Sequence, residues 1–176
     1  MKYLFASDLH GSAYYAEKLI ARFEEERADR LVLLGDLLYH GPRNPLPEGH
    51  NPQRVAELLN EKKDVILAVR GNCDAEIDQM LLAFPCLADY AVIDLGKKLL
   101  YLTHGHLPLP PLQKGSLLLN GHFHVPACEE RENYTYLNCG SLSLPKENSP
   151  HSYLVYENGL FVWKDENGTE FMRYSV

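Results

Sequence analysis

Five short apolar segments in the first 124 residues are each followed by side chains that can bind a metal ion. The segments read KYLFAS, LVLLG, VILAVRG, LLYLT and LLLNG, and each has the length of a buried β-strand. Strands that lie side by side in one sheet bring their ends together, so groups far apart in sequence can share one site. These groups are Asp8, His10, Asp36, Asn72, His104, His122 and His124.

None of these motifs is specific alone. An Asp at a strand end usually forms a turn or caps a helix, and a lone histidine is more often structural. Asn72, within Arg70-Gly71-Asn72-Cys73-Asp74, would ordinarily be a turn residue. All of them follow an apolar run, however, and a glycine adjoins Asp36, Asn72, His104 and His122. Because glycine lets the backbone approach a ligand closely, we interpret the seven groups as ligands of one shared metal centre.

The order of apolar and helical segments predicts an α/β fold in a single domain over residues 1–176. The first half alternates strands at 2–7, 31–35 and 64–70 with helices at 12–28, near 53–62 and at 75–83, and Ser12 is a candidate N-cap. This rhythm favours a parallel sheet. The second half contains strand-like segments, with a hairpin turn at Glu157-Asn158-Gly159. We expect two mixed sheets packed face to face, with helices outside.

Composition narrows the classes of protein that fit. The net charge is −7 and no basic stripe is visible, so no stable nucleic-acid partner is expected. No apolar run approaches the ~20 residues of a membrane span, and no signal-peptide pattern is visible at the N-terminus. The four cysteines form no C-x-x-C pair, which favours free thiols and a cytoplasmic location.

The ordered motifs resemble those of the calcineurin-like metallophosphoesterase superfamily. They read Asp8-x-His10, Gly35-Asp36, Gly71-Asn72-x-Asp74, His104-Gly105-His106 and Gly121-His122-x-His124. Gly71-Asn72-Cys73-Asp74 and the stretch at 40–44 are similar to a subgroup of small bacterial phosphodiesterases. The resemblance implies a four-layer α/β/β/α sandwich, the metallo-dependent phosphatase fold, and a binuclear centre. It also implies that Asp8, His10 and His124 bind one metal, that Asn72, His104 and His122 bind the other, and that Asp36 bridges both.

The expected activity is hydrolysis of a small-molecule phosphodiester by a hydroxide that bridges the two metals. Oxygen and imidazole donors without thiolate suit Mn²⁺, our first choice, as well as Fe, Co²⁺, Ni²⁺ or Zn²⁺. Arg43 and His40 are candidate substrate contacts, with Arg43 stabilising negative charge in the transition state. Asp74 is expected to orient a ligand histidine.

Cys73 departs from the family pattern, because many relatives carry histidine there. Cys73 either takes over a catalytic role, which would favour substrates with good leaving groups, or only packs beside the site, and both readings stay open. A homo-oligomeric state also stays open.

A second function class also stays open. One branch of the superfamily has this fold but serves as a protein-binding scaffold, with a degraded metal site.

Overall fold

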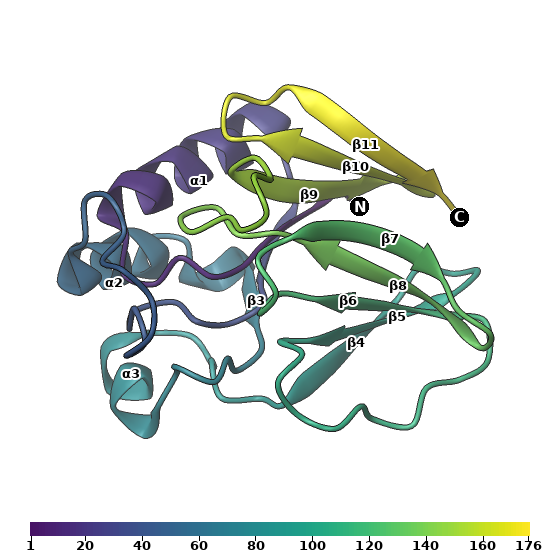
Figure 1. The fold of residues 1–176 in the computed structure, drawn as a ribbon, viewed down its shortest axis with the longest axis horizontal. Coiled ribbons are helices and arrows are strands. Elements are labelled where there is room, and N and C mark those ends of the chain that lie inside the picture. The colour runs from purple at the N-terminus through teal and green to yellow at the C-terminus, as the bar shows by residue number, and fades with distance from the viewer.

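Two β-sheets packed face to face form the centre of the structure, a computed structural model that describes residues 1–176 (Figure 1). The first sheet has the order β11-β10-β9-β1-β2-β3 and the second the order β4-β5-β6-β8-β7. The strands of the first sheet are β1 (Tyr3–Ala6), β2 (Arg30–Leu33), β3 (Ile66–Ala68), β9 (Ser152–Glu157), β10 (Leu160–Asp165) and β11 (Glu170–Ser175). Those of the second are β4 (Tyr90–Asp94), β5 (Leu99–Thr103), β6 (Ser116–Asn120), β7 (Pro126–Glu130) and β8 (Tyr134–Cys139).

Each sheet is mixed, as predicted, and contains three neighbouring parallel strands. Strands β1, β2 and β3 are parallel to one another, and so are β5, β6 and β8. Strands β9, β10 and β11 of the first sheet, and β4 and β7 of the second, pair antiparallel. Within each sheet the carboxyl ends of the three parallel strands therefore meet at one edge.

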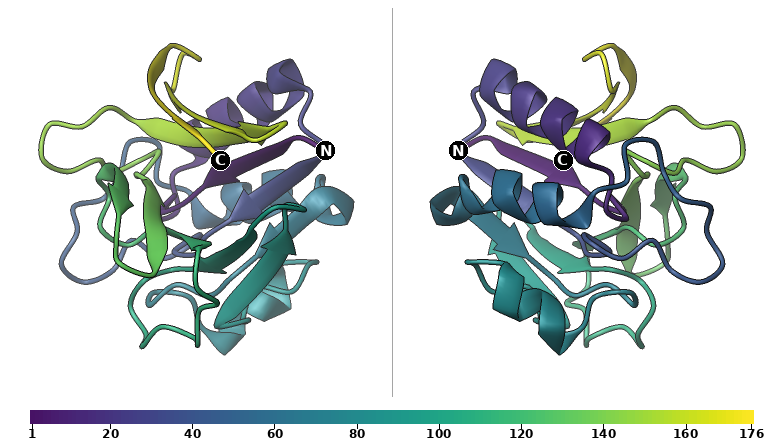
Figure 2. Two further views of the ribbon diagram at one scale, coloured as in Figure 1. Left: turned by 90° about the vertical axis from the view of Figure 1, so that its right-hand side faces the viewer. Right: turned by 90° about the vertical axis from the view of Figure 1, so that its left-hand side faces the viewer.

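Helices α1 (Ala13–Glu26) and α2 (Pro52–Asn60) pack on the outer face of the first sheet (Figure 2, right). A short 3₁₀ helix, η1 (Lys63–Val65), follows α2, and the third α-helix, α3 (Glu76–Leu81), follows β3. The predicted N-cap of α1 is confirmed, because the Ser12 hydroxyl accepts the Tyr15 N–H at 3.2 Å. Leu19 of α1 and Leu59 of α2 pack with Leu31 of β2, and all three side chains are fully buried.

The second core lies between the sheets and includes Phe5, Leu102, Leu119 and Trp163. No helix lies in the chain after Leu81, and a loop segment packs on the outer face of the second sheet. There Tyr101, Leu118 and Tyr136 pack with Leu112 of the segment that joins β5 to β6. That segment reads LPLPPL at 107–112, and its prolines disfavour a helix.

Two local predictions need correction. The strand expected through LLLNGHFHV ends at Asn120, because His122 and His124 have left-handed backbone with φ of 65° and 61°. Strand β7, which follows at once, was not predicted.

The hairpin turn is confirmed, since Asn158 and Gly159 both have positive φ and Glu157 pairs with Leu160. No helix has the length and apolar character needed to cross a bilayer.

Candidate metal centre

The seven predicted ligands lie together where the parallel strands of both sheets end. The first sheet places Asp8 and His10 after β1, Asp36 after β2 and Asn72 after β3. The second sheet places His104 after β5, and His122 and His124 after β6.

Asp8, His10 and His124 form a buried group with their donor atoms turned inward. Asp8 Oδ1 lies 3.2 Å from His124 Nε2 and 3.5 Å from His10 Nε2. The two imidazole Nε2 atoms lie 3.4 Å apart. Each of the three residues is at most 2% exposed. This is the set that the family resemblance assigns to one metal.

Asn72, His104 and His122 form the neighbouring group. His104 Nε2 lies 3.1 Å from Asn72 Oδ1 and 3.3 Å from His122 Nδ1. Asp36 lies between the two groups, since its Oδ2 is 3.4 Å from His104 Nε2 and 3.7 Å from His10 Nε2. The position of Asp36 is the one that a bridging ligand needs.

Backbone carbonyls fix the orientation of three imidazole rings. In His10, His104 and His124 the Nδ1 atom faces a carbonyl oxygen, so Nδ1 carries the proton and donates it. When the ring is neutral, the Nε2 lone pair points into the cluster, as it does in histidine ligands of metals. The accepting carbonyls belong to Tyr39, Leu34 and Leu144, at 2.9, 2.6 and 2.5 Å respectively.

Polar atoms of the cluster that lack a partner show whether a metal fits it. Asp8 is fully buried, yet its Oδ1 has no hydrogen-bond partner. An unpaired buried carboxylate oxygen is costly, and so are two nitrogen lone pairs facing each other at 3.4 Å. Divalent cations resolve both problems, and the mixed oxygen and imidazole donors suit a transition metal. The residues present therefore fit the metals that the sequence predicts.

The ionisation of the cluster follows from its opposite charges. Burial alone would raise the pKa of Asp8, but the imidazoles of His104, His10 and His124 outweigh it and hold the pKa well below the usual range. The pKa of Asp36 is lowered too, because His104 outweighs burial. Burial would lower the pKa of His104, whereas Asp8 and Asp36 raise it to about 9. Both carboxylates are thus held ionised.

The ligands sit on strained backbone that neighbouring groups hold in place. Five of the seven have positive φ, where residues other than glycine are uncommon; they are Asp8, His10, Asp36, His122 and His124. The Asp8 carbonyl accepts hydrogen bonds from the hydroxyls of Ser141 and Ser143, both at 2.8 Å. Sequence reasoning missed these serines. The available signal was the Ser-x-Ser spacing directly after strand β8, which parallels Asp8-x-His10 after β1.

Asp74 has a different partner from the one predicted. Its carboxylate contacts no histidine and instead accepts three backbone N–H groups, from Asp36, Leu37 and Gly71, at 2.7 to 2.9 Å. Asp74 therefore ties the loop after β2 to the loop after β3 and positions Asp36 through its main chain. Gly71 permits this approach, since a Cβ there would overlap the Asp36 carboxylate.

An open cavity of about 430 Å³ leads from the cluster to solvent. Its wall contains the candidate ligands Asp36, Asn72, His122 and His124. The rest of the wall comes from Gly41, Pro42, Arg43, Asn44, Cys73, Phe123 and Lys146. The structure thus places Arg43 beside the cluster, as predicted, and adds Lys146 and Phe123, which sequence reasoning did not select.

Cys73 and His40 differ in their relation to this cavity. Burial, and then the Asp36 carboxylate, raise the pKa of the Cys73 thiol to about 12. His40 does not line the cavity: its ring packs edge-on against Tyr39 and His50, and its carbonyl accepts the Asn44 side-chain amide at 2.8 Å. The predicted substrate contact at His40 stays a prediction; in this structure the His40 carbonyl helps to shape the loop that carries Arg43.

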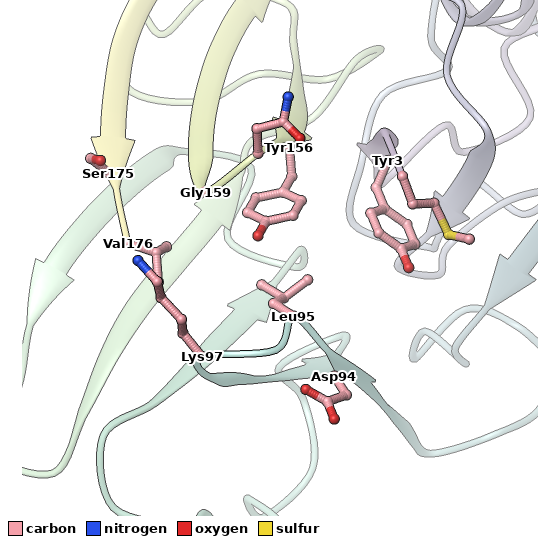
Figure 3. A pocket seen from close by; sticks show the side chains of 10 residues that line it. Tyr3, Asp94, Leu95, Lys97, Tyr156, Gly159, Ser175 and Val176 are labelled. Carbon is pink, nitrogen blue, oxygen red and sulfur yellow. The ribbon is translucent and has the colours of Figure 1, made fainter.

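A larger cavity, about 610 Å³, is lined by Tyr3, Tyr156, Leu95, Lys97 and Val176 among others (Figure 3). Both ends of the chain contribute to it, through Met1 and Val176. None of the candidate ligands lines it. Its volume alone therefore does not make it the better candidate for catalysis.

Comparisons with known proteins agree with this geometry. The family profile described as the calcineurin-like phosphoesterase superfamily domain matches residues 1–158. The chain is 49% identical over 162 residues to phosphodiesterase YfcE of Escherichia coli strain K12, covering 90% of this chain and 88% of the relative. A solved structure of YfcE, described as a phosphoesterase from E. coli, superimposes with a TM-score of 0.95 at 43% identity and covers 99% of both chains.

More distant structures share the fold. Wild-type Vps29 from Entamoeba histolytica, complexed with zinc, gives a TM-score of 0.64 at 18% identity over 99% of both chains. The two mixed sheets, the ordered motifs and the family match lead to one assignment: this chain belongs to the calcineurin-like phosphoesterase superfamily.

Proposed function

We propose that this protein is a metal-dependent phosphodiesterase that hydrolyses a small-molecule phosphodiester at the cluster of Asp8, Asp36 and the four histidines. Two divalent cations per chain are the proposed cofactors, with Mn²⁺ preferred and Fe, Co²⁺, Ni²⁺ or Zn²⁺ as alternatives. The observation that carries the proposal is the convergence of inward-facing donor atoms around a fully buried Asp8 Oδ1 that has no hydrogen-bond partner. The name of the relative YfcE supports the choice of a diester.

The residues have separate tasks in this proposal. Bound divalent cations would supply Lewis acidity, lowering the pKa of a water and neutralising charge on the phosphoryl oxygens. Asp8, His10 and His124 would hold one cation, Asn72, His104 and His122 the other, and Asp36 both. The Nδ1–H bonds to backbone carbonyls keep three of the rings in their ligating orientation.

Two cations of the protein itself would bind the substrate's phosphate. Arg43 and Lys146 line the cavity from different loops, and neither forms an ion pair with a carboxylate. An unpaired guanidinium and an unpaired ammonium beside the site can attract an anionic diester and stabilise charge that develops in the transition state. The protein as a whole has a net charge of −7, so these two unpaired cations make the cavity a locally positive region that attracts an anionic substrate.

The test is turnover of bis(4-nitrophenyl) phosphate by metal-reconstituted protein. We expect wild type with Mn²⁺ to release 4-nitrophenolate, and Asp36→Asn to be slower by at least about a thousandfold. Elemental analysis of both proteins shows whether the loss of turnover follows a loss of metal. Equal rates for the two proteins, or no turnover by wild type with any of the five metals, would refute the proposal.

The protein-binding scaffold is the weaker candidate. A scaffold has no need for a complete ligand set, whereas here every predicted ligand position is filled and turned inward. Catalysis also explains the unpaired cations in the cavity, which a degraded site would not require.

A further inference from the structure

A second concave surface adjoins the candidate active site and has a different chemistry. It is a groove of about 580 Å³ on the outer face of the second sheet. Phe123 is the one residue that lines both this groove and the cavity at the metal cluster. The groove is also lined by Leu107, Leu109, Glu129, Arg131, Tyr136 and Glu147.

The groove presents exposed apolar and aromatic side chains. Phe123 is 51% exposed, Leu109 45% and Leu107 37%. The groove also contains two stacked planar groups, because the Arg131 guanidinium lies 4.5 Å from the centre of the Tyr136 ring. Exposed apolar side chains that gather beside a catalytic cavity mark a binding surface better than scattered ones do.

The charges of the groove favour an uncharged occupant. Arg131 is paired with Glu129 at 2.9 Å, and Glu147 forms no ion pair. One unpaired carboxylate therefore remains, and it repels an anionic group. The unpaired cations Arg43 and Lys146 line the cavity and not the groove. The cavity therefore suits the anionic part of a substrate, and the groove suits an uncharged part.

We propose that the groove binds an uncharged aromatic substituent of the phosphodiester, with Phe123 as the specificity-determining side chain. This inference rests on the proposed phosphodiesterase function. During hydrolysis an oxygen from water bonds to phosphorus, the bond from phosphorus to the leaving oxygen breaks, and the proton goes to the leaving group or to solvent. The entering and leaving oxygens lie on opposite sides of phosphorus. The substituent that points sideways, toward Phe123, is then the one retained on the monoester product.

Two diesters with the same leaving group isolate this contact. Bis(4-nitrophenyl) phosphate and methyl 4-nitrophenyl phosphate both release 4-nitrophenolate but retain an aryl or a methyl group. The measured quantity is the ratio of their kcat/KM values, aryl over methyl. Comparing that ratio among variants cancels the intrinsic difference in reactivity between the two esters. We expect Phe123→Ala to lower it roughly tenfold and Leu109→Ser about threefold.

Phe171→Ala is the matched control. Phe171 lies on β11, is 42% exposed and lines neither the cavity nor the groove, so the ratio should not change. Leu109 does not line the cavity at the metal cluster, and elemental analysis of each variant shows whether Phe123→Ala has disturbed metal binding. An unchanged ratio in both groove variants, or an equal loss for the two esters, overturns the proposal. Failure of wild type to hydrolyse either ester instead rejects the phosphodiesterase function itself.

Discussion

Two clusters of charged side chains in this protein use their carboxylates in opposite ways. At the end of helix α1, Glu26 is satisfied: its Oε2 pairs with Lys2 at 2.8 Å, and its Oε1 accepts from Lys164 and from the Tyr153 hydroxyl. At the strand ends, Asp8 Oδ1 has no hydrogen-bond partner although Asp8 is fully buried. The pKa of each carboxyl is lowered, because neighbouring positive groups outweigh burial. Only the second cluster has donor atoms to spare for a ligand. The paired carboxylate of Glu26 contributes to the stability of the fold, whereas the unpaired Oδ1 of Asp8 is available to a ligand.

The sharpest way to break this comparison is to neutralise Asp8. We expect Asp8→Asn to lower phosphodiester turnover by at least about a thousandfold and to reduce the metal content, because the amide removes a negatively charged ligand from the first group. Steady-state kinetics and elemental analysis measure the two effects. The comparison fails if the variant retains both full metal content and wild-type turnover.

Removing the metals should cost stability as well as activity. Each cation present at 100 times its Kd stabilises the native state by about 2.7 kcal/mol, so chelation of both should lower Tm by about 10–20 °C. Differential scanning calorimetry before and after chelation, and again after adding Mn²⁺, measures this shift. Asp8→Asn serves as the control, since a chelator should move its Tm much less. An identical Tm with and without metal would show that the cluster is already satisfied.

Asp74 tests whether the cluster depends on backbone positioning. Asp74→Asn keeps the shape of the side chain but replaces one acceptor oxygen by a donor, which faces at least one of the N–H groups of Asp36, Leu37 and Gly71. We expect metal affinity to fall about 10- to 100-fold, as for other groups that position a ligand. Isothermal titration with Mn²⁺ gives the affinity. Unchanged affinity would mean that the neighbouring loops hold Asp36 without this carboxylate.

The smallest expected effect belongs to the satisfied cluster. Glu26→Gln should lower the free energy of unfolding by about 1–2 kcal/mol and leave turnover unchanged. Because the folded pKa of Glu26 is lowered from 4.5, its stabilisation is complete above about pH 4.5 and is lost as the pH falls through the folded value. Urea unfolding of both proteins at several pH values should show a constant difference near neutrality that shrinks in acid. A difference that grows toward low pH contradicts this sign.

The sequence predicts a site residue best where a metal-binding residue type directly follows a strand-like apolar run. Asp8, Asp36 and His104 could be predicted because metal-binding residue types directly follow apolar runs, and parallel strands bring such ends together. The sheets were predictable for the same reason, from the length and spacing of those runs. Strand β6 was predicted too long, since nothing in the residue type of His122 or His124 announces a left-handed backbone.

The surroundings of the ligands were harder to predict. Lys146 is brought to the cavity by a long loop, and loop conformation follows from many weak contacts rather than from a periodic pattern. Ser141 and Ser143 act through the Asp8 carbonyl, a main-chain group that leaves no mark in a list of residue types. His40 shows the converse: its residue type suggested a substrate contact, but its ring packs against Tyr39 and His50.

The left-handed ligands have a consequence for protein engineers who would copy this centre into another scaffold. Transplanting the side chains of Asp8, Asp36 and His122 onto regular strand ends would point them in the wrong directions. A recipient must also reproduce the hydroxyls of Ser141 and Ser143, the Asp74 carboxylate and the bare backbone of Gly71. What must be transferred is therefore the set of hydrogen-bonded loops, and not only the seven candidate ligands that they carry.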